Sequence, residues 1–300
     1  MELYKFMIIV IMGPTASGKS RLALETASQI NGEIISFDSM QVYRGLEIGT
    51  AQPTEEEKRQ IPHHLVGIYD ISQRLDVYTF TELAEKAVAD VLARGKTPIL
   101  AGGTGMYLRS FLYGMDDMPG DRKVRTELDA LYDAPEKEAA LHAKMAETDP
   151  EVLEKFRDCR RRLIRALEVR IVSGKSILEL QQNLPRKLRY DVKAFKLEMA
   201  PEVLNERIAA RSDIMLREGW IEEAENAIAR GLLETPTAHQ ALGYKIIASY
   251  LKGELDKGEL REKLVIATRQ YARRQRTWFR HQHPEAVSLS SPESPLPIFR

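Results

Sequence analysis

Short apolar runs alternate with helix-like patterns through the first hundred residues of the chain. Asn31 and Gly32 mark a turn before the second apolar run. Thr79 and Glu82 have the spacing of a capping box at the start of a helix, and Gly95 suits the C-terminus of that helix. Such alternation is typical of a parallel α/β sheet, which we predict here. The predicted strands lie at 6–12, 33–37 and 98–101, and the predicted helices at 21–30 and 79–94.

After the third predicted strand the strand signals stop, and charged helical segments take over. Helix starts are indicated at 133–136 and 149–151, and Gly174 indicates a helix end. We therefore predict a helical insertion domain at 115–189.

The remaining sequence predicts a return to the sheet and then more helices. An apolar run at 192–199 has the pattern of a strand, and Pro201 opens a helical C-terminal region. We expect the serine- and proline-rich residues 288–300 to form an extended tail. The α/β core would thus combine residues 1–114 with residues 190–300.

Composition limits the class of protein. With 300 residues, 43% of them hydrophobic, the chain is long enough to bury a full core. No apolar run reaches the roughly 18 to 20 residues that a membrane span requires, so we expect a cytoplasmic globular protein without membrane contact. The single cysteine, Cys159, excludes an internal disulfide framework and a cysteine-built zinc site. Because 44 basic and 44 acidic side chains cancel, any surface for nucleic acid must come from local clusters.

A phosphate-binding motif follows the first predicted strand. It fits G-x-x-x-x-G-K-[ST] between a strand and a helix, the context that distinguishes a P-loop from a chance glycine-rich turn. Backbone N–H groups of such a loop surround phosphate oxygens, Lys19 adds a full charge, and Ser20 is the candidate ligand for Mg²⁺. The motif predicts a P-loop NTPase-like core that binds a nucleotide or another di- or triphosphate, but it does not identify the reaction. Its residues are Gly13, Pro14, Thr15, Ala16, Ser17, Gly18, Lys19 and Ser20.

Polar residues also follow the other two strands of the predicted N-terminal sheet. Asp38 and Ser39 come after the second, and the glycine-rich segment containing Thr104 comes after the third. Ligands of open α/β sheets lie outside the carboxyl ends of the strands, so these residues are candidates for one cleft with the P-loop. Asp38 would bring a carboxylate that accepts a proton or holds a metal-bound water. Alternatively, Asp38 caps a turn and the glycines fit a tight connection, and position alone leaves both interpretations open.

With these residues identified, the chain closely resembles the bacterial tRNA dimethylallyltransferases. The resemblance rests on the P-loop and on the run Asp-Ser-Met-Gln-Val-Tyr-Arg-Gly-Leu-Glu-Ile-Gly-Thr at 38–50, which is the more specific of the two. Further similar segments extend the resemblance over nearly the whole chain. They lie at 62–65, 101–107, 161–168, 242–245 and 267–278.

The resemblance implies a reaction and a set of residues. A dimethylallyl group would pass from dimethylallyl diphosphate to the exocyclic amine of the adenosine 3′-adjacent to the anticodon, in tRNAs reading codons that start with U. The products would be isopentenyladenosine and diphosphate, with Mg²⁺ as cofactor. Asp38 would accept the amine proton, while Thr104 and Arg211 would contact the leaving diphosphate. The implied contacts with the tRNA anticodon stem-loop are Asp38, Ser39, Met40, Gln41, Thr104, Arg125, Arg161, Arg162, Arg165, Arg274 and Gln275.

Two positions depart from the family pattern. Gln52 stands where many relatives carry lysine, and Cys159 stands where aspartate or asparagine is common. Neither residue belongs to the implied chemistry.

Arginines cluster in two segments, 157–165 and 269–280. At helical spacing several of them share a face, as expected of a surface that holds an RNA backbone. The alternative is a solvated face paired with nearby acids. We favour RNA for the second cluster, which has no acid between Arg269 and His283, and leave the first open.

Aromatic, methionine and histidine residues near these segments have simpler alternatives. Met40 and Tyr43 fit either stacking on the target base or the core. The histidines at 63–64 and 281–283 are not accompanied by cysteines or carboxylates at metal-site spacing, so we expect structural roles for them.

Three other functions fit parts of the sequence. An isopentenyltransferase acting on free adenine nucleotide would need neither the insertion nor the basic C-terminal helix. A P-loop metabolite kinase would transfer phosphoryl groups without tRNA, and an RNA-binding P-loop switch protein would transfer nothing. Eukaryotic tRNA relatives often carry a zinc-finger extension, so a chain with one cysteine is expected to be of the bacterial form. We also expect it to act as a monomer.

Overall fold

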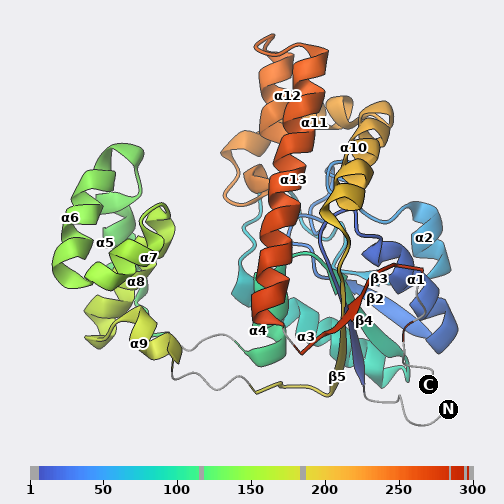
Figure 1. Cartoon of the computed structure of the whole chain (residues 1–300), viewed down its shortest axis with the longest axis horizontal. Helices are drawn as coiled ribbons and strands as arrows, with labels where there is room; N and C mark the ends of the chain where they lie inside the picture. Colours follow the sequence, from blue (N-terminus) through green and yellow to red (C-terminus); the bar gives the residue numbers. More distant parts are fainter. Residues whose placement is uncertain (1–6, 115–117, 183–186, 284, 294–295, 297–300) are drawn as a thin grey trace. The chain divides into compact units, whose positions relative to one another are not determined.

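The computed structural model describes residues 7–114, 118–182, 187–283, 285–293 and 296 (Figure 1). Contacts within the chain divide it into two units, which are described separately. Unit 1 comprises Met1–Gly114 and Leu188–Arg300, and unit 2 comprises Met115–Lys187. The second boundary thus falls two residues before the position expected from the sequence.

Unit 1 is built on a parallel sheet with the strand order β3-β2-β4-β1-β5-β6, so the predicted α/β fold class is confirmed. The strands at either edge were not predicted. The expected tail at 288–300 is wrong in its first residues, which pair with β5, and its residues 294–295 and 297–300 lie outside the described residues. The strands are β1 (Ile8–Met12), β2 (Gly32–Ser36), β3 (His63–His64), β4 (Thr97–Gly102), β5 (Val192–Leu197) and β6 (Val287–Leu289).

Both faces of the sheet are covered, as the alternation along β1 shows. Ile8 and Val10 belong to the core on one face, and Ile9 and Ile11 belong to the core on the other, which is the period of two of a strand. One face packs against α1, and the opposite face packs against α3, α4 and the C-terminal helices. A sheet buried in this way reads as continuous apolar runs, which is why its central strands were predictable.

The helices of unit 1 begin and end largely where the sequence signals them. Asn31 and Gly95 both have left-handed backbone, with φ of 53° and 69°, and terminate their helices as predicted. The capping box predicted at Thr79 is wrong, because α3 begins two residues earlier and the Asp76 side chain accepts the Thr79 N–H at 2.9 Å. The helices are α1 (Lys19–Ile30), α2 (Glu55–Gln60), α3 (Val77–Ala93), α4 (Gly105–Tyr113), α10 (Pro201–Arg217), α11 (Trp220–Ala229), α12 (Tyr244–Leu251) and α13 (Lys257–Gln282), with 3-10 turns at Leu232–Glu234 and Ala238–Gln240.

Unit 2 is helical in its described residues and has its own apolar core, which includes Leu141 and Leu163. Asp149 caps α7 and Gly174 ends α8, as predicted. Asp133 closes α5, and the helix start predicted at 133–136 is the 3-10 turn that begins at Pro135. The helices are α5 (Arg122–Tyr132), α6 (Glu138–Thr148), α7 (Pro150–Phe156), α8 (Arg160–Ser173) and α9 (Ile177–Gln182), with a 3-10 turn at Pro135–Lys137. Across the described part of the chain, no helix is long and apolar enough to cross a membrane.

Candidate active site

The loop at 13–20 joins β1 to α1, as its motif predicts. Gly18 caps α1 with a φ of 91°, and a Cβ at this position would lie 2.8 Å from Pro292, so only glycine fits. No side chain caps the start of α1. Its first N–H groups therefore remain available to an anion, and the positive end of the helix dipole favours one.

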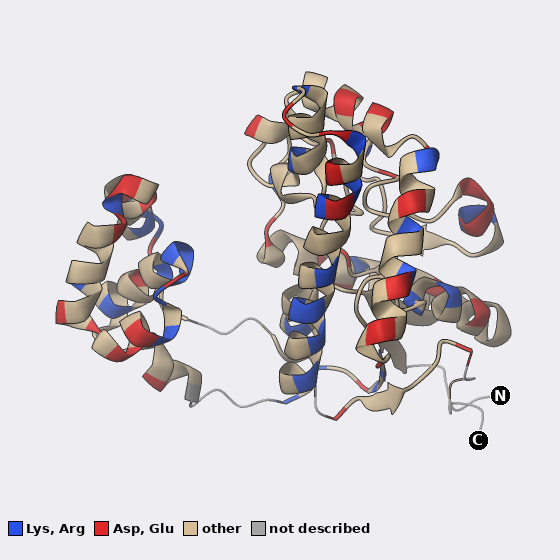
Figure 2. Ribbon diagram, turned by 45° about the horizontal axis from the view of Figure 1, so that its top comes forward, with Lys and Arg blue, Asp and Glu red and all other residues tan. Residues whose placement is uncertain are grey.

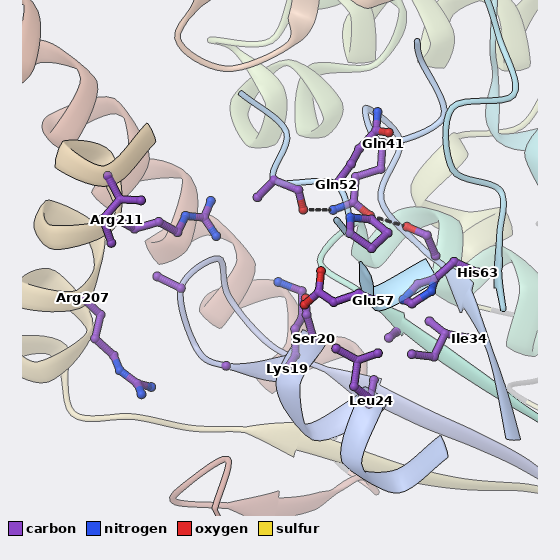
Figure 3. Close-up of a pocket in the computed structure, with 18 of the residues that line it drawn as sticks. Lys19, Ser20, Leu24, Ile34, Gln41, Gln52, Glu57, His63, Arg207 and Arg211 are labelled. Carbon is purple, nitrogen blue, oxygen red and sulfur yellow. Dashed lines mark hydrogen bonds between the residues drawn. The ribbon is translucent and has the colours of Figure 1, made fainter. Parts of the chain in front are cut away.

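A cavity of about 490 Å³ opens beside this loop (Figure 3). Lys19 and Ser20 line it from α1, while Arg207 and Arg211 extend toward it from successive turns of α10. Arg207 also donates a long hydrogen bond, 3.4 Å, to the backbone oxygen of Ser17. Arg207 was not predicted as a site residue, and its spacing of four from Arg211 was the only signal in the sequence.

Three charged groups of this site interact with one another. Burial and then the Arg211 guanidinium lower the pKa of Lys19, and the Asp38 carboxylate opposes both, so that the pKa stands at about 8. Burial also lowers the pKa of Arg211, again opposed by Asp38. The two cations exceed the single carboxylate, so an anion entering the cavity would stabilise their charged forms.

Asp38 lies in the loop that follows β2, and Thr104 holds this loop in place. The Thr104 hydroxyl accepts the Ser39 N–H at 3.0 Å, and the Thr104 N–H donates to the Phe37 oxygen at 3.1 Å. Asp38 Oδ1 accepts the Met40 N–H at 3.0 Å, while the described residues offer no hydrogen bond to Oδ2. The carboxylate thus caps its own turn with one oxygen while its charge acts on Lys19 and Arg211, so the two interpretations of the sequence are compatible.

The glycines around Thr104 allow two other elements to approach closely. A Cβ on Gly102 would lie 2.2 Å from the Phe37 oxygen, and a Cβ on Gly103 would lie 2.2 Å from Gln275 Nε2. The end of β2 and the helix α13 therefore both pack directly against this turn. The glycines therefore do form a tight connection, and this close packing is part of how the site is assembled.

Gln275, for which the resemblance implies a tRNA contact, has its side chain engaged within the protein. It is buried, its Oε1 accepts the Thr15 N–H at 2.8 Å, and its Nε2 donates to the Gly103 oxygen at 2.9 Å. Its side-chain amide therefore joins the P-loop to the glycine turn. Both of its partners are backbone groups more than 170 positions away, so no local pattern indicates this role.

Tyr271 is a second contribution of α13 that the sequence did not reveal. Burial raises the pKa of the Tyr271 phenol, and the nearby Asp38 carboxylate raises it further. The neutral phenol therefore lies in the electrostatic field of the candidate base. The only signal was its spacing of one helical turn from Gln275.

Gln41 was expected to contact tRNA, but its side chain is engaged within the protein. Its Oε1 accepts the Ser36 hydroxyl at 2.7 Å, and its Nε2 donates to the Thr50 and Ala51 oxygens at 3.1 and 2.8 Å. Gln41 therefore holds the two ends of the family-like run 38–50 together at the wall of the cavity.

Of the residues near Gln41 in the sequence, two belong to the core and one lines the cavity. Tyr43 is fully buried, which confirms its core interpretation, and Met40 is partly buried against the same core. Gln52 lines the cavity, and its Nε2 donates to the Tyr43 oxygen at 2.7 Å. The residue that departs from the family pattern at this position thus supports the loop.

In unit 2 the predicted arginines have two different environments. Arg165 lies 2.7 Å and Arg125 lies 3.6 Å from the buried Glu168 carboxylate, so these two are paired with an acid, which was the alternative left open for the first cluster. Arg161 and Arg162 are exposed at the start of α8. Cys159 precedes them at the helix N-terminus without capping it, consistent with the loss of an Asp or Asn there.

Along α13 the predicted basic face is present. Arg269, Arg273, Arg274 and Arg280 are exposed, and the blue segments of the α13 ribbon in Figure 2 show that basic residues are concentrated in the C-terminal half of the helix. The Arg274 guanidinium also lies 5.8 Å from the centre of the Tyr271 ring.

The histidines pack as structural residues. His64 Nε2 lies 2.7 Å from Glu33 Oε2, and Glu33 also accepts hydrogen bonds from Arg94 and Lys96. His63 bonds the Ile61 oxygen at 2.7 Å. Within the described residues, no group of three or more His, Cys, Asp or Glu side chains is arranged to hold a metal ion.

Comparisons with known proteins point to one family. The chain matches a family model described as IPP transferase over residues 41–282 and one described as isopentenyl transferase over residues 6–75. It is 42% identical to the tRNA dimethylallyltransferase of Exiguobacterium sp., over 93% of this chain and 88% of the relative. It is 43% identical to that of Acetivibrio thermocellus, over 91% of this chain and 88% of the relative.

Solved structures agree with these matches. The full-length tRNA isopentenylpyrophosphate transferase from Bacillus halodurans is similar with a TM-score of 0.70 and 36% identity, over 95% of this chain and 89% of that one. A eukaryotic dimethylallyltransferase acting on tRNA is similar with a TM-score of 0.79 and 28% identity, over 95% of this chain and 74% of that one.

Proposed function

The chain belongs to the IPP transferase family and is a tRNA dimethylallyltransferase, and we propose that the 490 Å³ cavity is its donor site. The diphosphate of dimethylallyl diphosphate lies along the loop at 13–20, with Lys19, Arg207 and Arg211 around its oxygens. The observation that carries this proposal is that Lys19, Arg207 and Arg211 line one cavity beside the P-loop, with the Asp38 carboxylate near enough to raise the pKa of Lys19 and of Arg211. It brings an excess of positive charge for the leaving group and a carboxylate for the nucleophile into one place.

Asp38 acts as the base in this proposal. The exocyclic nitrogen of adenosine attacks the first allylic carbon, the bond from that carbon to the diphosphate oxygen breaks, and the diphosphate leaves with the electron pair. Asp38 takes the proton from the nitrogen. An aromatic amine is a poor nucleophile, so proton removal and charge neutralisation on the leaving group lower the barrier from both ends.

Thr104 serves as a positioning residue here. Its hydroxyl accepts the Ser39 N–H, which fixes the loop that carries Asp38. A contact between Thr104 and the diphosphate, which the resemblance implies, would have to coexist with that bond.

Mg²⁺ belongs to the proposal, and the residues of the cavity suit it. The Ser20 hydroxyl opens on the cavity beside Lys19, and no all-protein cage of acidic side chains is arranged there among the described residues. This fits an ion that takes few ligands from protein and the rest from phosphate oxygens and water. When bound, Mg²⁺ supplies neutralisation of the charge that develops on the diphosphate.

The exposed arginines are the proposed tRNA contacts. Arg273 and Arg274 on α13, and Arg161 and Arg162 on α8, bind the backbone of the anticodon stem-loop. The target adenosine leaves its stack to reach the donor carbon, and a single-stranded loop makes this inexpensive.

A transfer assay tests the proposal. The full chain is incubated with Mg²⁺, labelled dimethylallyl diphosphate and unmodified tRNA, and the RNA is recovered and digested to nucleosides. We expect label in one modified adenosine and an equal amount of released diphosphate. Label that stays in the donor, together with phosphate released from ATP, would instead indicate a kinase or a switch protein.

A further inference from the structure

A second cavity, of about 290 Å³, also borders the P-loop but shares no lining residue with the donor cavity. Pro14 lines it, whereas the donor cavity is lined by the later residues of the same loop. Its remaining wall comes from the carboxyl end of β5, the start of α10 and the C-terminal half of α13. Carboxyl ends of parallel strands are where ligands of such sheets bind, and nothing in the proposed reaction uses this space.

Lys196 is the buried charge of this cavity. It stands in β5 opposite Met12 of β1, and only 8% of the residue is exposed. Its ion-pair partner among the described residues is Glu198, at 3.6 Å, which is beyond a normal hydrogen bond. A buried ammonium with such a distant partner is poorly compensated, so a closer anion would stabilise it.

Two arginines add to this charge. Arg276 and Arg280 line the cavity from successive turns of α13, and neither forms an ion pair within the described part of the chain. Counting Lys196 and both arginines against Glu198, the lining carries three positive charges and one negative charge, a net of +2.

The start of α10 adds a partial charge of the same sign. Ala200 caps this 17-residue helix without a side-chain hydrogen bond, and Pro201 occupies its first position. Both residues line the cavity, so the positive end of the helix dipole lies at its wall.

We propose that this second cavity is a phosphate-binding site, separate from the donor site, in which Lys196, Arg276 and Arg280 hold one phosphate group. The group comes either from an RNA backbone or from free inorganic phosphate. By helical spacing, Arg269, Arg273, Arg276 and Arg280 fall on one face of α13, so an RNA strand lying along this face would reach the cavity at its end. The RNA source rests on the proposed function, whereas the site itself does not.

Salt dependence of tRNA binding tests the RNA source. Two variants of the full chain are compared with the unmodified chain. One is the double variant Arg276→Gln/Arg280→Gln, and the other is Arg280→Gln alone, at an exposed position. Because the two arginines hold one phosphate group, losing both should reduce the slope of log affinity against log salt by about 1, and losing Arg280 alone should reduce it by less. The matched control is Lys252→Gln/Lys257→Gln, which removes two exposed charges near the opposite end of α13 and should leave the slope unchanged.

Titration with inorganic phosphate at constant ionic strength tests the site without RNA. In a Lys19→Ala chain, whose P-loop is weakened, phosphate should still bind, and adding Arg276→Gln/Arg280→Gln should weaken this binding at least about tenfold. Loss of phosphate binding with an unchanged tRNA slope identifies the free anion as the ligand, and a reduced slope identifies RNA. An unchanged slope together with unchanged phosphate binding overturns the proposal. Failure of the proposed function is distinct, because it requires the unmodified chain to leave tRNA unlabelled.

Discussion

Replacing Arg211 by glutamine should change the pH dependence of donor binding as well as its strength. After burial, the Arg211 guanidinium is the next largest cause that lowers the pKa of Lys19 to about 8. Without it, the pKa of Lys19 should move back toward the ordinary value of 10.5. The variant thus loses one cation from the cavity but keeps the other protonated to a higher pH.

These two effects set the size of the loss in donor affinity and its dependence on pH. A hydrogen bond to a charged group contributes about 1.5–3 kcal/mol, so the variant should bind dimethylallyl diphosphate roughly 10- to 150-fold more weakly near neutral pH. Lys19 binds the anion in its protonated form, so affinity of the unmodified chain falls above about pH 8, by up to about tenfold per pH unit. The fall begins at higher pH in the variant, and its deficit should therefore shrink as pH rises.

The assay is a binding titration of dimethylallyl diphosphate with Mg²⁺ between about pH 7 and pH 10, which brackets the pKa shift of Lys19. The ratio of the two affinities cancels the titration of the ligand itself. Arg207→Gln is the control, because Arg207 lines the same cavity but does not contribute to the lowered pKa of Lys19. The ratio of donor affinities between the unmodified chain and Arg207→Gln should be independent of pH. A pH-independent ratio for Arg211→Gln as well would refute the electrostatic coupling.

Three more predictions concern stability and RNA binding. Burial raises the pKa of Glu33 but its hydrogen bonds lower it to about 2, so Glu33→Gln should cost on the order of 3 kcal/mol above about pH 4.5. In urea unfolding this difference should vanish as pH falls toward about 2, and a difference constant with pH would count against it. Gly103→Ala should lower stability by about 1–3 kcal/mol, because a Cβ lies 2.2 Å from Gln275 Nε2; an unchanged melting temperature would contradict this. Arg274→Ala should reduce the salt slope of tRNA binding by about 1 without changing donor affinity, and an unchanged slope would exclude the contact.

The parts of the fold that follow from local patterns were predictable from the sequence. The buried central strands read as apolar runs, and the P-loop has a fixed spacing of glycines and lysine between a strand and a helix. The edge strand β3 has only His63 and His64, so its pairing depends on β2 rather than on a pattern of its own. The same holds for β6, which has only three residues, one of them Ser288. Its pairing depends on the edge of β5 and not on a pattern of its own.

The candidate site was predictable only where a residue carries its own motif. Lys19 and Asp38 follow strand ends, and the structure brings both to one site. Gln275, Tyr271 and Arg207 act through contacts with segments far away in the chain, which no local pattern encodes. The same tertiary contacts explain why the Gln275 side chain is buried.

The most direct test of the account is the single-turnover rate of prenyl transfer in Asp38→Asn. Asparagine keeps an oxygen for the Met40 N–H, which Asp38 Oδ1 accepts at 3.0 Å, so the loop should retain its shape. The account predicts a rate lower by about 100- to 10,000-fold, with tRNA and donor affinities within about threefold of the unmodified chain. A rate close to that of the unmodified chain, or a loss of affinity as large as the loss of rate, would contradict the role of Asp38 as the base.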